Sequence, residues 1–490
     1  MSAIYATRLP FPQANGPDVM LTVEGDEFYA RYETDDGYTT VYDDARGLYC
    51  YAALHNGRLI SSGDSIAAPP SMGIEPHLRD EPDVHNDKFD QRFQQARPLD
   101  MVGSPVPEVF GPNKGLLEGR QLNEGPVRGL TILVNFQDVK TPIPADAVAA
   151  MLNAENYHVN GNYCSVRDYF RLMSTDKLDY QNTVVGPITL SRKRDYYIAN
   201  PLMAEALNTV VDMGVDLSQF DSKQAGILDA VSFLYAGNVV YKDWLWPHNF
   251  SLNWSSNGYK TGLYQISALG SNAGELVIGT FCHESGHMLC RFPDLYDYGK
   301  RDGDFGLSAG LGNYCLMSSG NHANEGRTPI AICAYLRYLA GWCSNVIDIK
   351  PGGTFHAAHG AYDTVFFFPG ATKNEYFLIE NRSQLGLDAH LPAGGLAVYH
   401  CDINGTNEHE AGSPARHYQC ALLQADGRFD LEQNKNQGDA SDLFTLASGE
   451  IANATSTPST RLWNGKDSGL RISDVGVVGE DIAFRVNGPH

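Results

Sequence analysis

The pentapeptide His283-Glu-Ser-Gly-His287 is the most informative stretch of this chain, and it predicts a helix that carries a metal site. On a helix, His283 and His287 are four residues apart, lie on one face and can offer imidazole nitrogens to one zinc ion. Glu284 lies one step round the helix, where it can take a proton from a zinc-bound water. Because a long chain can contain this pattern by chance, a polar helix face with two ordinary histidines is the alternative.

The sequence on both sides of the pentapeptide supports a buried helix followed by a turn. Residues 274–282 are mostly apolar and contain no proline, as expected for the buried side of a helix. Pro293 ends the helix, and the chain then turns back. Since a catalytic zinc has three protein ligands and one open position, this turn can supply the third ligand. Asp294, directly after Pro293, is the first candidate, and Asp297 is the alternative.

A methionine stands a short distance downstream, in Tyr314-Cys-Leu-Met-Ser-Ser-Gly320. A methionine in a tight turn at this distance matches the Met-turn of metzincin-type proteases. A core methionine beside a loop is the alternative interpretation of Met317 taken alone. The zinc-binding pattern, the aspartate turn and Met317 together favour a zinc protease.

Several further stretches, spread along nearly the whole chain, resemble one family of proteins, the immune inhibitor A-like metallopeptidases. These stretches are Arg128-Gly-Leu-Thr-Ile-Leu-Val-Asn-Phe-Gln-Asp138, Ser165-Val-Arg-Asp-Tyr-Phe170, Phe292-Pro-Asp-Leu-Tyr-Asp297, Leu316-Met-Ser318, Tyr376-Phe-Leu-Ile-Glu-Asn-Arg382 and Leu422-Leu-Gln-Ala-Asp-Gly427. The resemblance implies an α+β, metzincin-like protease domain. It also implies that His283, His287 and Asp294 bind zinc, with Glu284 as the general base.

The sequence departs from the family pattern at the third ligand. Many members carry a glycine three residues after the second histidine, and an aspartate three residues beyond that glycine. Here Cys290 occupies the glycine position, and Asp294 comes one residue later. Because of this departure, Asp297 remains an alternative to Asp294 as the third ligand. The thiols of Cys282 and Cys290, which flank the zinc helix, are a competing pair of soft ligands.

Four regions follow from composition and turn signals. Residues 1–75 alternate strand-like runs with hairpin turns and predict a small β-rich unit, which the resemblance identifies as a pro-region. Residues 76–127, rich in Pro, Asp, Arg and Gln, predict a linker or extended arm. Residues 128–345 form the expected catalytic domain. Residues 346–490 are strand-rich again and predict a β-sandwich-like module.

Two local patterns in these regions are specific enough to name. Ser165, followed three residues later by Asp168, predicts the start of a helix in the catalytic domain. In the C-terminal region, four aspartates cluster in sequence; a solvated acidic loop is the favoured interpretation, and a calcium site is the alternative. These four are Asp426, Asp430, Asp439 and Asp442.

Composition and charge argue against several classes of partner. The net charge of −22 is unfavourable for binding nucleic acid or an anionic membrane. There is no run of 18 or more apolar residues, so no transmembrane span is expected. The first residues lack the basic and apolar segments of a Sec signal peptide, and an extracellular location is implied by the resemblance alone. The sequence does not indicate an oligomeric state.

The function expected from the sequence is that of a zinc-dependent endopeptidase acting on protein or peptide substrates. An inactive protease scaffold that serves in binding or adhesion is the alternative, and it predicts a damaged motif. Glu284 and both histidines are intact here. A zinc-dependent amidase or carbohydrate-active enzyme is a further alternative, which the aspartate turn and Met317 make less favourable.

Overall fold

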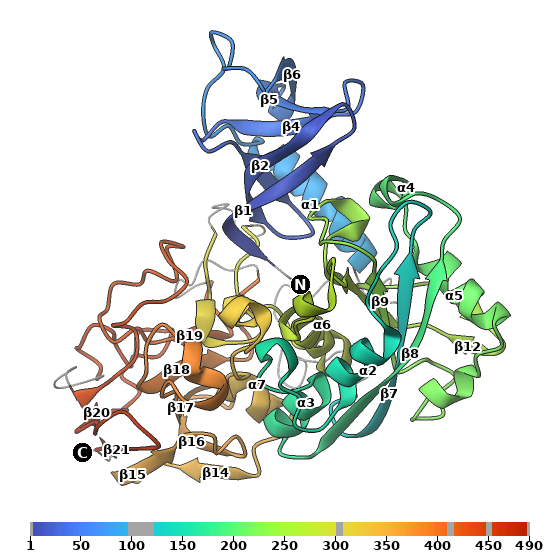
Figure 1. Ribbon diagram of the computed structural model, residues 1–490. Helices are drawn as coiled ribbons and strands as arrows, with labels where there is room; N and C mark the ends of the chain where they lie inside the picture. Colours follow the sequence, from blue (N-terminus) through green and yellow to red (C-terminus); the bar gives the residue numbers. More distant parts are fainter. Residues whose placement is uncertain (1–2, 97–121, 300–306, 409–415, 447–452, 488–490) are drawn as a thin grey trace. The chain divides into compact units, whose positions relative to one another are not determined.

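The computed structural model describes residues 3–96, 122–299, 307–408, 416–446 and 453–487 (Figure 1). The chain divides into two compact units, Ser2–Arg97 and Pro98–His490. Helices and sheets are mixed, in an arrangement of the broad α+β kind. Among the described residues, no helix combines the length and the apolar composition that crossing a membrane requires.

The first unit is a six-stranded antiparallel sheet in chain order, followed by one helix. Its last hairpin has a two-residue turn, in which Asn56 and Gly57 have φ values of 48° and 74°. This conformation is the one that an Asn-Gly pair adopts readily. The elements are β1 (Ile4–Gln13), β2 (Gly16–Gly25), β3 (Ala30–Glu33), β4 (Thr39–Asp43), β5 (Leu48–His55), β6 (Arg58–Ser65) and α1 (Pro82–Ala96).

The predicted boundary at residue 75 and the predicted linker 76–127 are wrong in part. The first unit continues to Arg97, and α1 lies within the segment that was expected to be extended. Phe89 of α1 is fully buried, and its ring lies 4.8 Å from the ring of Phe28. Because α1 is strongly polar, its sequence carries little apolar periodicity. The rest of the predicted linker, apart from residues 122–127, lies outside the described residues.

The second unit begins with a five-stranded sheet in the order β10-β13-β9-β7-β8 (Figure 1). Its strands are parallel except β10, which runs antiparallel to β13. The strands are β7 (Gly125–Asn135), β8 (Leu178–Thr189), β9 (Ala230–Tyr235), β10 (His248–Ser251) and β13 (Leu263–Ala268). A small separate hairpin joins β11 (Ser255–Ser256) to β12 (Tyr259–Lys260).

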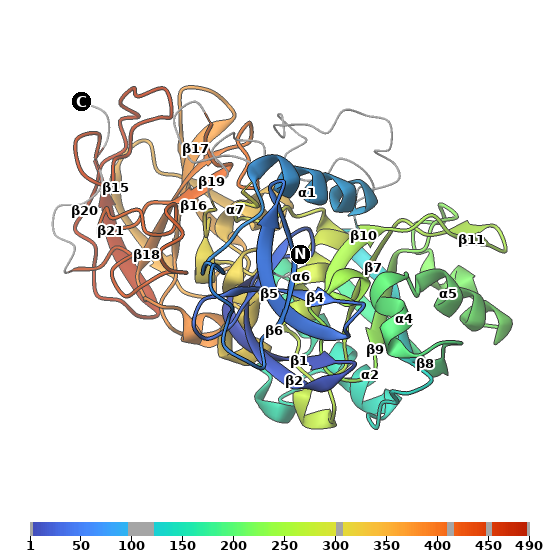
Figure 2. The ribbon, with the colours of Figure 1, turned by 90° about the horizontal axis from the view of Figure 1, so that it is seen from above.

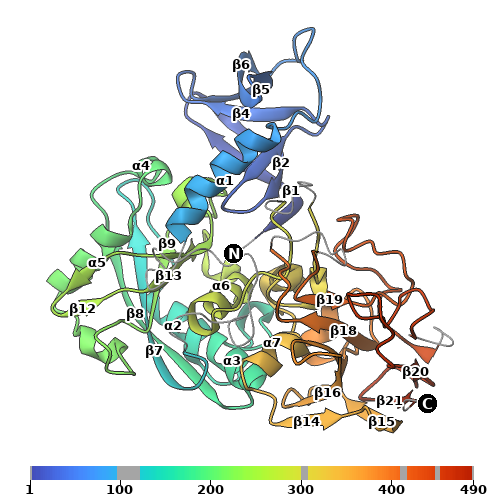
Figure 3. The ribbon, with the colours of Figure 1, turned by 180° about the vertical axis from the view of Figure 1, so that it is seen from behind.

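Six helices belong to this unit. The predicted start at Ser165 is confirmed, because its hydroxyl accepts the main-chain N–H of Asp168 at 3.1 Å. The helix α6 packs against β10, β13 and α3, and it lies in the middle of the unit (Figure 3). The helices are α2 (Ala145–Asn153), α3 (Val166–Ser174), α4 (Arg194–Ala199), α5 (Met203–Asp212), α6 (Gly279–Cys290) and α7 (Ala334–Leu339).

The C-terminal strands form two further sheets, which lie next to each other at one end of the unit (Figure 2). The five-stranded sheet has the order β14-β16-β17-β18-β19, and the three-stranded sheet has the order β15-β21-β20. The strands are β14 (Asn345–Asp348), β15 (Gly353–Ala358), β16 (Thr364–Pro369), β17 (Glu375–Asn381), β18 (Leu396–Asp402), β19 (Cys420–Leu422), β20 (Ile472–Ser473) and β21 (Asp481–Val486).

The two sheets share a core, as in a sandwich, but residues 346–490 do not form a separate module. In β17, Phe377 and Ile379 pack into the core between the two sheets. Tyr376 and Leu378, on the other face, belong to the same core as residues of α3 and α6. Because successive side chains of a strand point to opposite faces, β17 contributes to both cores. The expected β-sandwich-like module thus shares a core with the helices that precede it in the chain.

Candidate metal centre

The helix α6 is completely enclosed apart from its first turn, and its sequence explains where it ends. From Phe281 to Cys290 every residue is buried. Arg291 adopts the left-handed conformation, with φ of 57°, and its N–H bonds the main-chain oxygen of His287 at 2.9 Å. The C-terminal cap of the helix is therefore Arg291, two residues before Pro293. The chain reverses there and returns toward the helix.

This reversal brings three ligand-type side chains together, namely His283, His287 and Asp294. The Nε2 atoms of the two histidines are 3.2 Å apart. Asp294 Oδ1 lies 3.2 Å from Nε2 of His283 and 3.4 Å from Nε2 of His287. Four tetrahedral ligands about 2.0–2.1 Å from a zinc ion are separated by about 3.3–3.4 Å. The triangle formed by these three atoms, Nε2 of His283, Nε2 of His287 and Oδ1 of Asp294, therefore has the size that a tetrahedral zinc site requires.

Each imidazole is oriented by a main-chain carbonyl behind it. His283 Nδ1 lies 2.7 Å from the oxygen of Leu316, and His287 Nδ1 contacts the oxygen of Phe292. A carbonyl can only accept, so each Nδ1 carries the proton and donates it. The unprotonated Nε2 of each ring consequently faces the centre of the triangle. This is the usual arrangement of zinc-binding histidines.

Burial and charge keep these groups in the forms that bind a metal. Desolvation lowers the pKa of His287 below its ordinary value, which favours the neutral imidazole. Burial by itself raises the pKa of Asp294. The pKa of Asp294 nevertheless lies well below its ordinary range, so the carboxylate is ionised. The donor set is then two imidazole nitrogens and one carboxylate, which suits Zn²⁺.

Glu284 and Met317 are the two other residues near these ligands that the sequence singled out, one on α6 and one packed against it. Glu284 is fully buried and follows the first ligand on α6. A Cβ atom added to Gly286 would be only 2.7 Å from Sδ of Met317, so the glycine allows the methionine to pack directly under the helix. The main-chain oxygen of Met317 accepts the N–H of Leu295 at 2.7 Å. The Met317 turn therefore supports both the ligand helix and the returning loop.

The structure separates the alternative ligands from the triangle. Asp297 accepts the N–H of Gly299 at 2.8 Å and pairs through its main chain with Ser308. It does not belong to the close group of three. Cys282 and Cys290 are buried free thiols, and burial raises the pKa of both. A protonated thiol is a poor ligand. The geometry therefore favours Asp294 as the third ligand.

Two residues that the sequence did not identify complete the surroundings of Asp294. The hydroxyl of Tyr298 donates to Asp294 Oδ2 at 2.6 Å. Glu408, more than a hundred residues away in the sequence, accepts the main-chain N–H of Asp294 at 3.0 Å. Burial and the charge of Asp294 raise the pKa of Glu408 to about 7. No local pattern marks Glu408, because its contact depends on the packing of distant segments.

The predicted calcium ligands are only partly brought together. Asp426, Asp439 and Asp442 offer oxygens within 4.8 Å of one another, and Asp430 is not in this group. The guanidinium of Arg428 lies 2.5 Å from an oxygen of Asp426 and 2.8 Å from an oxygen of Asp439. Calcium takes six to eight oxygen ligands and is repelled by such a cation. Arg428 thus already occupies two of the three carboxylates, which argues against the calcium site.

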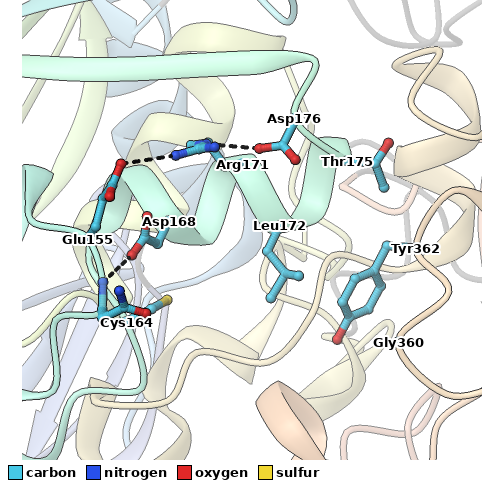
Figure 4. A pocket seen from close by; sticks show the side chains of 10 residues that line it. Glu155, Cys164, Asp168, Arg171, Leu172, Thr175, Asp176, Gly360 and Tyr362 are labelled. Carbon is cyan, nitrogen blue, oxygen red and sulfur yellow. Dashed lines mark hydrogen bonds and ion pairs between the residues drawn. The ribbon is translucent and has the colours of Figure 1, made fainter.

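A separate pocket of about 640 Å³ opens beside α3 (Figure 4). Its charged groups bind one another. Arg171 lies 3.5 Å from Glu155 and 2.9 Å from Asp176, and Asp168 accepts the N–H of Asn156 at 2.9 Å. None of the three residues of the metal centre lines it. The pocket therefore adds nothing to the chemistry of that centre.

Comparisons with known proteins do not bear on the assignment. The chain gives no match to a protein-family model and none to a curated protein.

Proposed function

We propose that this chain is a zinc-dependent endopeptidase, with His283, His287 and Asp294 as the metal ligands. The observation that carries the proposal is the triangle of two Nε2 atoms and one carboxylate oxygen, with sides of 3.2, 3.2 and 3.4 Å. Three protein ligands are typical of catalytic zinc, whereas structural zinc has four. The resemblance to immune inhibitor A-like, metzincin-type proteases supports the same proposal.

The chemistry assigns one further residue a role. A zinc ion in this triangle would polarise a peptide carbonyl and lower the pKa of water toward neutrality. Glu284, adjacent to His283 on α6, accepts the proton of the attacking water and passes it to the departing amine. His283 and His287 are fixed by the carbonyls of Leu316 and Phe292, so they do not take part in proton transfer.

The experiment that tests the proposal is hydrolysis of casein by the purified full-length protein, with and without a zinc chelator. We expect hydrolysis that the chelator abolishes and that added zinc restores. Glu284→Gln should bind one zinc ion per chain and leave casein intact. Zinc binding without hydrolysis by the wild type would instead support the alternative, a binding or adhesion protein on an inactive protease scaffold. A chain that binds no zinc would refute the proposed endopeptidase and its ligand set.

A further inference from the structure

The two carboxylate oxygens of Asp294 have different partners. Its Oδ1 atom faces the two histidine nitrogens, while its Oδ2 atom accepts the hydroxyl of Tyr298 at 2.6 Å. With Oδ2 engaged, the carboxylate presents a single oxygen to the centre of the triangle. Tyr298 and Asp294 are both buried, so water does not compete strongly for this hydrogen bond.

The turn that carries Asp294 and Tyr298 is anchored by Glu408. One carboxylate oxygen of Glu408 accepts the N–H of Asp294 at 3.0 Å and lies 3.3 Å from the hydroxyl of Tyr298. The main-chain oxygen of Glu408 accepts the N–H of Tyr298 at 3.1 Å. Glu408 therefore contacts the first and the last residue of the turn and holds them in a fixed relation.

Glu408 is itself fixed by the C-terminal sheet. The neighbouring side chain, Asn407, donates to the main-chain oxygen of Cys420 at 2.9 Å and accepts its N–H at 3.0 Å. Cys420 begins β19, whose partner in the sheet is β18. The contact thus runs from β19 through Asn407 and Glu408 to the third metal ligand. This explains why the C-terminal strands share a core with the catalytic helices.

We infer that Tyr298 and Glu408 are positioning residues for the zinc-binding carboxylate of Asp294, and that the C-terminal sheet sets the metal affinity of the centre through them. The inference rests on the proposed function. Hydrogen-bond partners of metal ligands typically contribute about 10- to 100-fold to metal affinity. Tyr298 and Glu408 act on the ion only through Asp294.

The test is the zinc affinity of the full-length protein, measured by competition with a chromogenic chelator. Tyr298→Phe should bind zinc about 10- to 100-fold more weakly than the wild type. Tyr169→Phe is the matched control, because its buried hydroxyl donates to the main-chain oxygen of Ile330 at 2.7 Å, away from the triangle. This control should bind zinc like the wild type, although it also loses a buried hydrogen bond.

A double-mutant comparison separates positioning from a general loss of stability. In an Asp294→Ala background, Tyr298→Phe should cause no further loss of zinc affinity, because the group through which it acts is gone. Glu408→Ala should weaken zinc binding, and Glu408→Gln should restore most of it, since the amide oxygen can still accept the N–H of Asp294. Thermal unfolding of the zinc-free proteins checks that each variant is folded.

The possible failures are distinguishable. Wild-type zinc affinity in both Tyr298→Phe and Glu408→Ala would overturn this inference and leave the proposed function standing. An equal loss from Tyr298→Phe with and without Asp294 would also overturn it. Absence of zinc binding by the wild type, or zinc binding that Asp294→Ala leaves unchanged, would refute the ligand set and thus the proposed function.

Discussion

Among the residues that the structure describes, two groups of three ligand-type side chains lie close together, and they differ in what surrounds their carboxylates. One is His283, His287 and Asp294, and the other is Asp426, Asp439 and Asp442. In the first group, two imidazoles lie next to the carboxylate of Asp294, and imidazole nitrogens can direct lone pairs toward an ion. In the second group a guanidinium, which has only N–H donors, binds two of the carboxylates.

The comparison shows that proximity of ligand atoms does not by itself make a metal site. The first group is oriented from behind by main-chain carbonyls and by Tyr298, so its lone pairs converge on one point. In the second group two of the three carboxylates bind Arg428, which already supplies positive charge. Two groups whose ligand atoms lie within 4.8 Å of one another therefore lead to opposite expectations for metal binding. Four predictions test this contrast, from the largest expected effect to the smallest.

Replacing Glu284 by alanine should abolish most peptidase activity and leave the metal bound. Loss of a general base typically costs about 100- to 10,000-fold in rate. The ligands are untouched, so zinc content should remain at the wild-type value. Casein hydrolysis and zinc analysis of the same preparation check the two parts of the prediction.

The control for this prediction is Glu275→Ala, which removes an exposed carboxylate just before α6 and should keep full activity. Activity of Glu284→Ala within about threefold of the wild type would remove the general-base assignment.

Replacing Asp294 by alanine should weaken zinc binding by more than about 100-fold. The reason is that Asp294 is a proposed ligand itself, whereas loss of a residue that only hydrogen-bonds a ligand costs about 10- to 100-fold. Asp297→Ala should bind zinc normally, because its carboxylate caps the N–H of Gly299 and lies outside the triangle. Zinc titration of the two variants decides between the two aspartates. Retention of zinc in the first variant and its loss in the second would assign the third ligand to Asp297.

Replacing Arg428 by glutamine should make the second group resemble a cation site. The three carboxylates would then face one another without the guanidinium, and we expect added calcium to raise the Tm of the variant more than that of the wild type. In chelator the variant should unfold no more than about 2–4 °C lower, since exposed ion pairs contribute little to stability. Zinc affinity should not change. An equal response of both proteins to calcium would show that Arg428 does not control this cluster.

Replacing Asp442 by asparagine should change the pH dependence of stability. Burial, together with the nearby Asp439 and Asp426, raises the pKa of Asp442 from 3.8 to about 6. The folded state therefore binds the proton more tightly than the unfolded state does. Its contribution to stability is present below about pH 4 and is lost as the pH rises to about 6. The free energy of unfolding of Asp442→Asn should thus increase relative to the wild type over this range.

Urea unfolding of the zinc-free proteins measures this difference without interference from the metal centre. Glu432, whose pKa burial raises to about 7, titrates in both proteins, and its contribution largely cancels in the comparison. A constant difference between variant and wild type from about pH 4 to about pH 6 would show that Asp442 keeps an ordinary pKa.

The part of the structure that follows from the sequence is local. The i, i+4 spacing places His283 and His287 on one face of α6, and Pro293 ensures a turn directly after the helix. Strands β16, β17, β18 and β21 lie in residues 346–490, which were expected to be strand-rich, since alternation and β-branched or aromatic residues are typical of strands. Such features depend on neighbours a few residues apart, so one sequence suffices to predict them.

Contacts between distant segments required the tertiary structure. The polar helix α1 was missed because it carries little apolar periodicity, although Phe89 is fully buried. Both faces of β17 are buried, and this joins the C-terminal sheet to the core that contains residues of α3 and α6.

The sequence by itself indicated the two histidines, Glu284 as a candidate general base and two aspartates as candidates for the third ligand. Only the tertiary structure selected Asp294 and supplied Tyr298 and Glu408 around it. Only the tertiary structure placed Arg428 among the aspartates of the second group. The physical reason is that helix geometry fixes side chains one turn apart, whereas hydrogen bonds across more than a hundred residues form only when packing brings those residues together.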